Sequence, residues 1–341
     1  MDRQRLCGLT VEEIFSIIEP EGFSYAMAGT IATWLYRKRT FDISEFTGLS
    51  KKLKNYIGEN TEPGIFEPAI SEKSSDGTIK YVFQNPEGQK FETVYIPDGK
   101  RITVCVSTQS GCRMGCPFCV TGSYGFHGNL TAGDIINQII RIPDSEKVNH
   151  IVFMGMGEPM DNLENVLKAC RIITSEWGLA ISSRNITVSS VGITPGIEEF
   201  LERTSCNLTL SLYSPFPEER VKIVPSESKF PMLEIIEILK RVPVKKKRRL
   251  SIAYVMMKDV NDTLRHLEEL IRILKNSGIK VNLLSFHPVE GDNTITSIPE
   301  RMMYFKHNLI VAGIPASVRK SRGKDISAAC GLLATGLISE K

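Results

Sequence analysis

The sequence lacks any run of apolar residues long enough to span a bilayer, and its N-terminus, MDRQRLCGLTVEEI, does not read as a signal peptide. It also lacks low-complexity segments and short-period repeats, which argues against a repeat architecture. Its net charge is only +3, a weak argument by itself for a polyanionic partner. These absences leave a cytosolic globular protein as the default, and 341 residues suffice for one large domain with a small one appended.

Basic residues nevertheless gather in short clusters, which lie at 37–39, 51–54, 245–249 and 319–324. Such clusters are typical of phosphate contacts, and the alternative for each one alone is a solvated surface. The run at 245–249 precedes a predicted strand, at the end opposite the loops that carry chemical motifs. We interpret this run as a solvated turn rather than as a phosphate contact.

The hydrophobic period changes twice along the chain. Residues 1–62 have helical spacing, residues 63–97 carry the turn signals SSDG and NPEG between β-rich runs, and strands alternate with helices over 98–330, before a tail at 331–341. Helices are expected at 11–20, 24–38 and 44–57, and parallel strands at 101–107, 150–156, 184–190, 206–213, 249–257 and 280–286. We therefore predict an α/β protein, a partial (β/α)6 TIM-like barrel with a small N-terminal helical accessory domain and a β-hairpin extension.

In such a barrel the functional residues lie at the carboxyl ends of the strands. The irregular, polar or Gly-rich stretches of this chain all fall there, and they are CRMGCPFC, GMGEPM, SSVG, SLYSP and SFHPVEG. All of them are therefore expected on one face of the barrel.

CRMGCPFC spaces Cys112, Cys116 and Cys119 as C-x3-C-x2-C. In a reducing compartment such a set indicates a metal or catalytic feature rather than disulfides. Three thiolates can hold a 4Fe-4S cluster by three of its irons, which leaves the fourth iron open to a non-protein ligand. The alternative is a zinc site with a distant fourth ligand. In GMGEP, Glu158 offers a carboxylate to an ammonium group.

The three-cysteine loop after the first barrel strand resembles that of radical-SAM enzymes. Over nearly its whole length the chain resembles the RlmN/Cfr family of radical-SAM RNA adenine methyltransferases. The matching segments are FETVYIP, CVSTQSGCRMGCPFCVTG, GNLTAGDIINQI, GMGEPMDNLENV, NITVSSVGITPGI, SLYSPFPEERVKIVP and VRKSRGKDISAACG. The resemblance implies a 4Fe-4S cluster on the three cysteines and S-adenosylmethionine (SAM) at the open iron, with two SAM molecules used per turnover.

The resemblance also implies three catalytic residues: Cys330 as the methyl carrier, Cys105 as the second catalytic cysteine and Glu92 as a proton acceptor. In the family's scheme the two extra cysteines are needed because carbon 2 of adenine is not nucleophilic and cannot attack a methyl sulfonium. SAM contacts carry over to Gly157, Glu158, Ser190, Ser211, Leu212, Tyr213 and His287. Tyr213 and His287 depart from a histidine and an asparagine that are common in the family. Cys7, Cys170 and Cys206 are interpreted as structural.

The implied substrate is an adenosine of 23S rRNA, with tRNA as a further candidate and the N-terminal helices as an RNA-binding accessory domain. The implied reductant is a flavodoxin or ferredoxin, and we expect a cytoplasmic monomer with no membrane partner. Three functions stay open: methylation at adenine carbon 2, Cfr-like methylation at carbon 8 that confers antibiotic resistance, and a non-catalytic zinc-containing RNA-binding protein. Carbon 2 is favoured because that activity is the housekeeping one.

Overall fold

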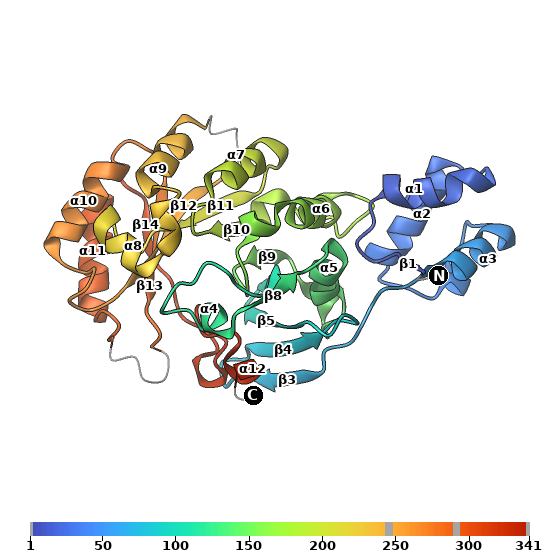
Figure 1. The fold of residues 1–341 in the computed structure, drawn as a ribbon, viewed down its shortest axis with the longest axis horizontal. Coiled ribbons are helices and arrows are strands. Elements are labelled where there is room, and N and C mark those ends of the chain that lie inside the picture. The colour runs from blue at the N-terminus through green and yellow to red at the C-terminus, as the bar shows by residue number, and fades with distance from the viewer. Residues whose placement is uncertain (1–2, 243–247, 289–293, 339–341) are drawn as a thin grey trace.

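The structure is a computed structural model that describes residues 3–242, 248–288 and 294–338. Its centre is a ten-stranded mixed sheet in the order β14-β13-β12-β11-β10-β9-β6-β5-β4-β3 (Figure 1). The six predicted parallel strands are β6 (Arg101–Cys105), β9 (His150–Phe153), β10 (Ile186–Ser190), β11 (Asn207–Ser211), β12 (Leu250–Met256) and β13 (Lys280–Ser285). The partial barrel predicted from the sequence is therefore confirmed.

The parallel part of the sheet has one more strand than predicted. β14 (Ala316–Val318) pairs parallel to β13, and helix α11 (Pro299–Val311) connects the two strands. β14 has only three residues, too few to show the period-2 alternation by which strands are recognised in a sequence.

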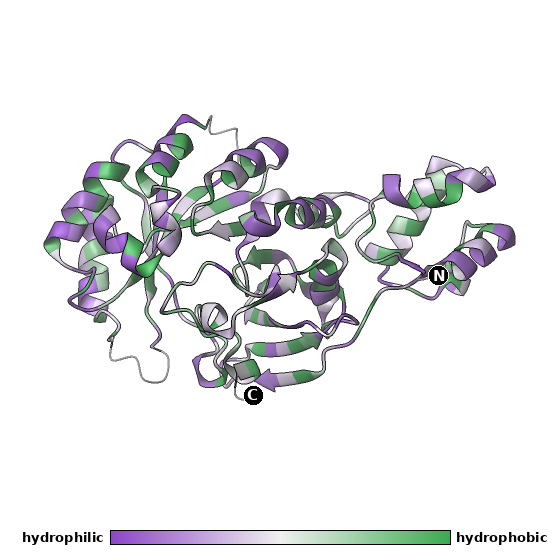
Figure 2. Cartoon of the chain, viewed as in Figure 1, coloured by the Kyte–Doolittle hydropathy of each residue, from purple (hydrophilic) through white to green (hydrophobic). Residues whose placement is uncertain are grey.

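Helices cover the outside of the parallel strands (Figure 1). They are α5 (Ala132–Ile140), α6 (Leu163–Thr174), α7 (Thr194–Arg203), α8 (Pro217–Ile223), α9 (Met232–Arg241) and α10 (Leu264–Leu274). Figure 2 shows that the helices carry hydrophobic and hydrophilic stripes, as expected for helices that bury one face. No helix in the described ranges is long and apolar enough to cross a membrane.

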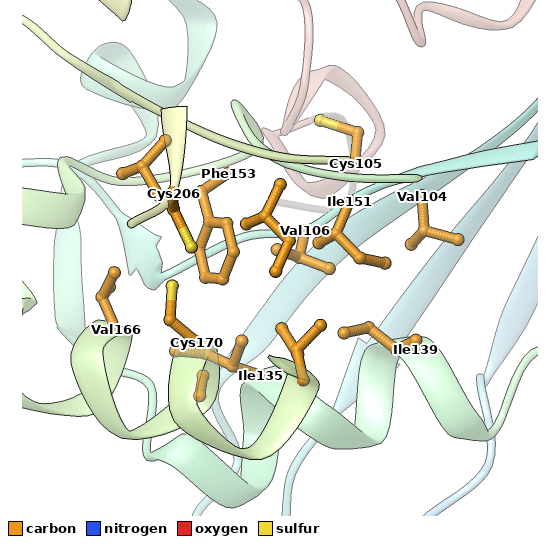
Figure 3. Close-up of a cluster of buried hydrophobic side chains, with 14 of the residues drawn as sticks. Val104, Cys105, Val106, Ile135, Ile139, Ile151, Phe153, Val166, Cys170 and Cys206 are labelled. Atoms are coloured by element: carbon orange, nitrogen blue, oxygen red, sulfur yellow. The ribbon is translucent and has the colours of Figure 1, made fainter. Parts of the chain in front are cut away.

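The core lies between the sheet and this helical layer (Figure 3). Val104 and Val106 are fully buried, whereas Cys105 between them points to the opposite side of the strand. Successive side chains of a strand point to opposite faces, so Cys105 is directed into the barrel. Cys170 of α6 and Cys206 before β11 face each other in the core, where both are buried.

The hairpins predicted over 63–97 extend the barrel sheet itself. β3 (Ile70–Lys73), β4 (Ile79–Gln84) and β5 (Lys90–Asp98) are antiparallel, and β5 also pairs antiparallel with β6. Both turn signals are observed as turns, with Gly77 and Gly88 at φ 85° and 81°. A backbone in this left-handed region favours glycine because glycine has no Cβ.

The N-terminal helices form a lobe beside the barrel (Figure 1). They are α1 (Val11–Ile18), α2 (Tyr25–Tyr36) and α3 (Lys51–Asn60). Thr10 caps α1, since its side chain accepts from the Glu13 N–H while Glu13 accepts from the Thr10 N–H. The third helix begins later than predicted, because Ser50 caps it through the Leu53 N–H.

The lobe meets the barrel where two glycines approach closely. A Cβ on Gly133, near the start of α5, would lie 2.5 Å from the carbonyl oxygen of Cys7. A Cβ on Gly8 would lie 2.3 Å from the backbone nitrogen of Gly133. Beside this contact, α1 and α6 are joined by ion pairs of Glu13 with Lys168 and Glu12 with Arg171.

We predict that Gly133→Ala lowers stability and loosens the lobe, because the new methyl group would overlap the Cys7 carbonyl and the backbone must shift. The expected loss is about 1–3 kcal/mol in the free energy of unfolding. Gly58→Ala is the control, since Gly58 is in α3 with nothing within 4 Å of a Cβ, and alanine there should be neutral or stabilising. Urea denaturation and limited proteolysis would check this, and equal behaviour of the two variants would contradict it.

Candidate active site

One cavity of about 760 Å³ opens inside the partial barrel. The site residues predicted from the sequence line it with two exceptions, and those on its wall are Cys105, Cys112, Cys116, Cys119, Gly157, Glu158, Ser190, Ser211, Tyr213, His287 and Cys330. The exceptions are Glu92 and Leu212. The fold thus brings residues that are more than 200 positions apart in the sequence to one internal surface.

The cysteine loop runs between β7 (Gln109–Gly111) and α4 (Val120–Tyr124). Gly115 turns the loop at φ 65°, and the Cys112 sulfur accepts from the Met114 N–H at 3.5 Å. Burial raises the pKa of the Cys112 thiol to about 12, and it also raises the pKa of Cys116. A bound metal would have to lower these pKa values again, because only the thiolate form of cysteine is a metal ligand.

The three thiols fit an iron–sulfur cluster better than a single ion. In the described part of the chain, no three His, Cys, Asp or Glu side chains come close enough to hold one metal ion. Each thiolate of a cluster binds a different iron, so cluster ligands lie farther apart than the ligands of one zinc ion. Cys112, Cys116 and Cys119 would hold the cluster, and they line the same cavity as Glu158.

Glu158 ties together the loops after β9 and β10. Its carboxylate accepts from the N–H groups of Met160 at 3.0 Å and Val191 at 2.9 Å. Burial raises the pKa of Glu158 to about 7, although the bond from Val191 opposes that shift. Next to it, Gly157 has φ 95°, and a Cβ there would lie 2.5 Å from the Gln109 Cβ. Only glycine therefore suits position 157.

Arg220 of α8 is fully buried behind the cavity wall. Its guanidinium donates to the carbonyl oxygens of Leu212 at 2.9 Å and Ser211 at 3.0 Å, and to that of Val191. Its counterion is the buried carboxylate of Glu227. One buried cation thus holds the loops after β10 and β11 at the cavity. Leu212, predicted as a SAM contact, instead accepts a hydrogen bond from Arg220 through its backbone carbonyl.

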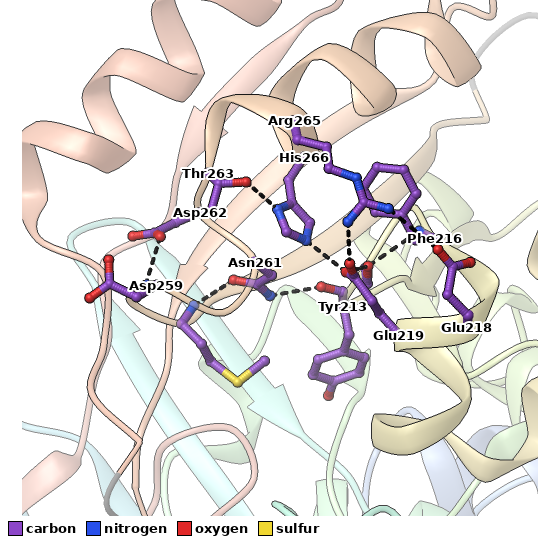
Figure 4. Close-up of polar contacts among 12 residues, drawn as sticks. Tyr213, Phe216, Glu218, Glu219, Asp259, Asn261, Asp262, Thr263, Arg265 and His266 are labelled. Atoms are coloured by element: carbon purple, nitrogen blue, oxygen red, sulfur yellow. Dashed lines mark hydrogen bonds and ion pairs between the residues drawn. The ribbon is translucent and has the colours of Figure 1, made fainter.

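Tyr213 sits on the loop after β11 in a left-handed conformation, φ 63°. The Asn261 amide donates to the Tyr213 carbonyl oxygen at 2.7 Å, as Figure 4 shows. The Tyr213 ring packs on that of Phe118 in the cysteine loop, with 4.4 Å between centroids. Burial raises the pKa of Tyr213, as do the thiols of Cys116, Cys119 and Cys330. Tyr213 therefore lies against the cysteine loop and within electrostatic reach of Cys330.

A polar network supports this loop from behind (Figure 4). The Glu219 carboxylate accepts from the Ser214 hydroxyl and contacts the His266 ring, each at 2.7 Å. The other ring nitrogen of His266 contacts the Thr263 hydroxyl, also at 2.7 Å. These linked contacts run from the loop to Thr263, so they hold the loop in one arrangement.

Cys105 and Cys330 face the cavity from different parts of the chain. Burial raises the pKa of the Cys105 thiol, and the nearby thiol of Cys330 raises it further. Cys330 is accessible to solvent within the cavity, where the surrounding protein also raises the pKa of its thiol. The two thiols are therefore within electrostatic reach of each other, beside the cysteine loop.

The loop that carries Cys330 is fixed at both ends. On one side, the Asp325 carboxylate accepts from the Ser74 hydroxyl at 2.6 Å and from the Ser75 N–H at 3.0 Å. On the other side, the Gly331 carbonyl accepts from the Val120 N–H at 2.9 Å, directly after the cysteine loop. The SSDG turn of the hairpin extension thus anchors the loop that presents Cys330.

Glu92 of β5 lies beside the cavity rather than on its wall, with its side chain fully buried. One carboxylate oxygen accepts from the Ala334 N–H at 2.9 Å, and the other is 3.9 Å from the Lys80 ammonium. Burial raises the pKa of Glu92, although the positive charge of Lys80 acts to lower it. A carboxyl group with a raised pKa is suited to proton transfer. The C-terminal segment separates it from the cavity.

The remaining predicted SAM contacts are polar residues at strand ends. The Ser190 hydroxyl accepts from the Gly192 N–H at 2.9 Å, and the Ser211 hydroxyl lies 3.2 Å from that of Ser189. His287 contacts the Ser321 hydroxyl at 2.9 Å, and burial lowers the pKa of its ring. His287 therefore joins the loop after β13 to the segment leading to Cys330.

Sequence reasoning missed the residues that hold the site from behind. Arg220 and Asp325 both lie in segments that resemble the family, but nothing in their local sequence indicates what they bind. Asn261 lies outside those segments. Each acts on a loop distant in sequence, so no local pattern could have identified it.

We predict that Arg220→Met destabilises the protein by about 3–5 kcal/mol, because it leaves the Glu227 carboxylate buried without its counterion. Arg203→Met is the matched control: Arg203 also pairs with carboxylates, Glu164 and Glu199, but at the surface, where the loss is about 1 kcal/mol or less. Urea denaturation curves of both variants measure the difference. Similar midpoints for the two variants would contradict the role of Arg220.

Known proteins are similar to this chain in sequence and fold. Residues 106–274 match the radical SAM superfamily. The probable dual-specificity RNA methyltransferase RlmN of Phocaeicola vulgatus is 44% identical over 330 residues, which are 97% of this chain and 95% of that protein. The protein of the same name from Thermus thermophilus is 41% identical over 320 residues, which are 92% of this chain and 89% of that protein.

The fold agrees with a solved structure of the same class. The crystal structure of a radical SAM methyltransferase from Sphaerobacter thermophilus matches with a TM-score of 0.89 and 36% sequence identity. The match covers 97% of this chain and 99% of that one. Membership of this superfamily implies SAM and a 4Fe-4S cluster, in agreement with the cysteine loop. The chain therefore belongs to the radical SAM superfamily and, within it, to the RlmN family of RNA methyltransferases.

Proposed function

We propose that this enzyme methylates carbon 2 of an adenosine in 23S rRNA through a methyl group carried on Cys330. The observation that carries the proposal is that Cys105 and Cys330 both face the cavity of the cysteine loop. A SAM enzyme that transferred its methyl group directly would need neither thiol. The relatives are named dual-specificity RNA methyltransferases, which supports tRNA as a second substrate.

In the proposed reaction, bound SAM and the cluster supply one methyl group and a deoxyadenosyl radical. The Cys330 thiolate accepts the methyl group, and transfer of a hydrogen atom from that methyl group to the deoxyadenosyl radical gives a carbon radical that adds to the adenine ring. The adduct then loses the ring proton, which Glu92 takes, and one electron, which the bound cluster would accept. For this step the Ala334 N–H must release the Glu92 carboxylate, which it covers here.

Cys105 then completes the cycle. Its thiolate attacks the Cys330 sulfur, the bond from that sulfur to the methylene carbon breaks, and the methylated base leaves. A Cys105–Cys330 disulfide remains and must be reduced before the next turnover. We propose a flavodoxin or ferredoxin as the electron donor, two SAM molecules per turnover, and a cytoplasmic monomer that binds RNA with its N-terminal lobe.

The direct test is mass spectrometry of nucleosides from RNA treated with the anaerobically reconstituted enzyme and SAM. We expect 2-methyladenosine. Appearance of 8-methyladenosine would replace the carbon-2 assignment with the Cfr-like reaction, and a colourless zinc protein without methylated RNA would overturn both.

We predict that Cys105→Ala still assembles the cluster and methylates Cys330 but stalls with RNA attached through the Cys330 methylene group. The purified variant should carry excess ultraviolet absorbance and a gel shift that survives denaturant and disappears on nuclease treatment. Cys330→Ala should bind cluster and SAM but form neither adduct nor methylated RNA.

Cys170→Ala is the control for both variants, because Cys170 is a buried cysteine outside the cavity wall. It should lose about 1 kcal/mol of stability and form no adduct. An RNA-free Cys105→Ala protein that turns over normally would show that Cys105 serves only packing. Normal methylation by Cys330→Ala would rule out the methyl carrier.

A further inference from the structure

Near the amino ends of the barrel strands lies a group of basic residues that the proposed reaction does not use. We call this group the floor cluster, and it consists of Arg101, His150, Arg249, Lys280 and Arg319. All five residues line the cavity that also holds the cysteine loop. Arg249 belongs to the basic run at 245–249, of which 245–247 lie outside the described residues. Arg249 is exposed to solvent, as that interpretation expects, and it also lines the cavity.

Strand geometry brings the floor cluster together. Arg101, His150 and Lys280 are the first residues of β6, β9 and β13, and Arg249 directly precedes β12. Parallel strands begin at the same edge of a sheet, so these side chains share one end of the barrel. Arg319 follows the short β14, and its guanidinium donates back to the Asn282 side chain at 3.2 Å, near the start of β13.

The charges of the floor cluster are not balanced by nearby carboxylates. Among the described residues, no carboxylate forms an ion pair within 4.0 Å of Arg101, Arg249, Lys280 or Arg319. Asp98 is close enough to act on Arg101, but its carboxylate is paired with Arg322 at 2.8 Å.

The cations act on one another instead. Burial lowers the pKa of Lys280, and the charges of Arg319 and Arg249 lower it further. Burial also lowers the pKa of Arg101, and the charges of the same two arginines lower it further. Burial also lowers the pKa of His150, with contributions from Arg101 and Arg249. This mutual repulsion is a cost that a bound anion would remove.

Uncharged polar side chains form part of the cavity wall between the floor cluster and the cysteine loop. Thr209 and Ser251 share a hydroxyl contact at 2.8 Å, and Thr103 and Asn282 also line the cavity. Arg101 and Cys105 are four residues apart on β6, a separation of about 13 Å along a strand. A small anion at the floor cluster would therefore not touch the cysteine loop.

We propose that the floor cluster binds a phosphate group at the amino end of the barrel. Guanidinium groups match phosphate oxygens two at a time, and several cations without a carboxylate partner in or beside the strands favour a multiply charged group over a carboxylate. The phosphate belongs either to a free phosphorylated molecule or to the RNA backbone. The binding site does not rest on the proposed methylation, because none of its residues has a part in that reaction.

The probe is inorganic pyrophosphate. Its binding to the reconstituted enzyme is measured by calorimetric titration and by thermal shift. Wild type should bind it with an affinity that falls as salt rises, and its Tm should increase. Lys280→Gln and Arg249→Gln should each weaken binding at least tenfold while the cluster content and SAM affinity stay unchanged. Lys275→Gln, an exposed lysine at the end of α10 away from the cavity wall, should bind as wild type does.

Substrate RNA distinguishes the two sources of phosphate. If RNA displaces pyrophosphate from wild type, and if Lys280→Gln also binds RNA more weakly than wild type does, the phosphate group comes from the RNA backbone. If RNA and pyrophosphate bind together, it comes from a free molecule, and either result supports the site. Wild type that shows no heat and no thermal shift at millimolar pyrophosphate overturns the proposal, as does equal binding by all variants.

Discussion

Seven neighbouring strands of the described chain run parallel, and this constraint organises the rest of the molecule. Because parallel strands end at the same edge, the loops with the cysteines, Glu158, Ser190, Tyr213 and His287 open onto one cavity. The hairpin extension and the C-terminal segment complete the wall, since the hairpin turn anchors Asp325 and the segment after Cys330 packs beside the cysteine loop.

Buried polar contacts keep these loops in position. Arg220 holds two of them through carbonyl oxygens, Glu158 joins two through backbone N–H groups, and Asn261 fixes the Tyr213 carbonyl. A buried group without a partner costs much more free energy than a partnered one gains, so such contacts select one loop arrangement. The cavity wall is thereby shaped before any cofactor binds.

The two ends of the cavity differ in charge. The carboxyl ends of the strands present thiols and the Glu158 carboxylate, where the family binds a cluster and SAM. The amino ends present Arg101, Arg249, Lys280 and Arg319 with no balancing carboxylate among the described residues. The pKa shifts of Lys280 and Arg101 and the distance along β6 from Arg101 to Cys105 are consistent with two separate binding regions.

The sequence alone determined what depends on local spacing: the helices and strands with clear periods, the cap at Thr10, the turns at Gly77 and Gly88, and the three cysteines on one loop. Glu92 and Cys330 were found through resemblance to a family rather than through any pattern of their own. Tertiary structure decided which side of β6 Cys105 faces, that Glu92 is covered by the Ala334 segment, and that Arg220 is buried. It also decided that Arg249 lines the cavity and that β14 adds a seventh parallel strand. The physical reason is that burial and pairing depend on groups brought close from distant positions, which local periodicity does not encode.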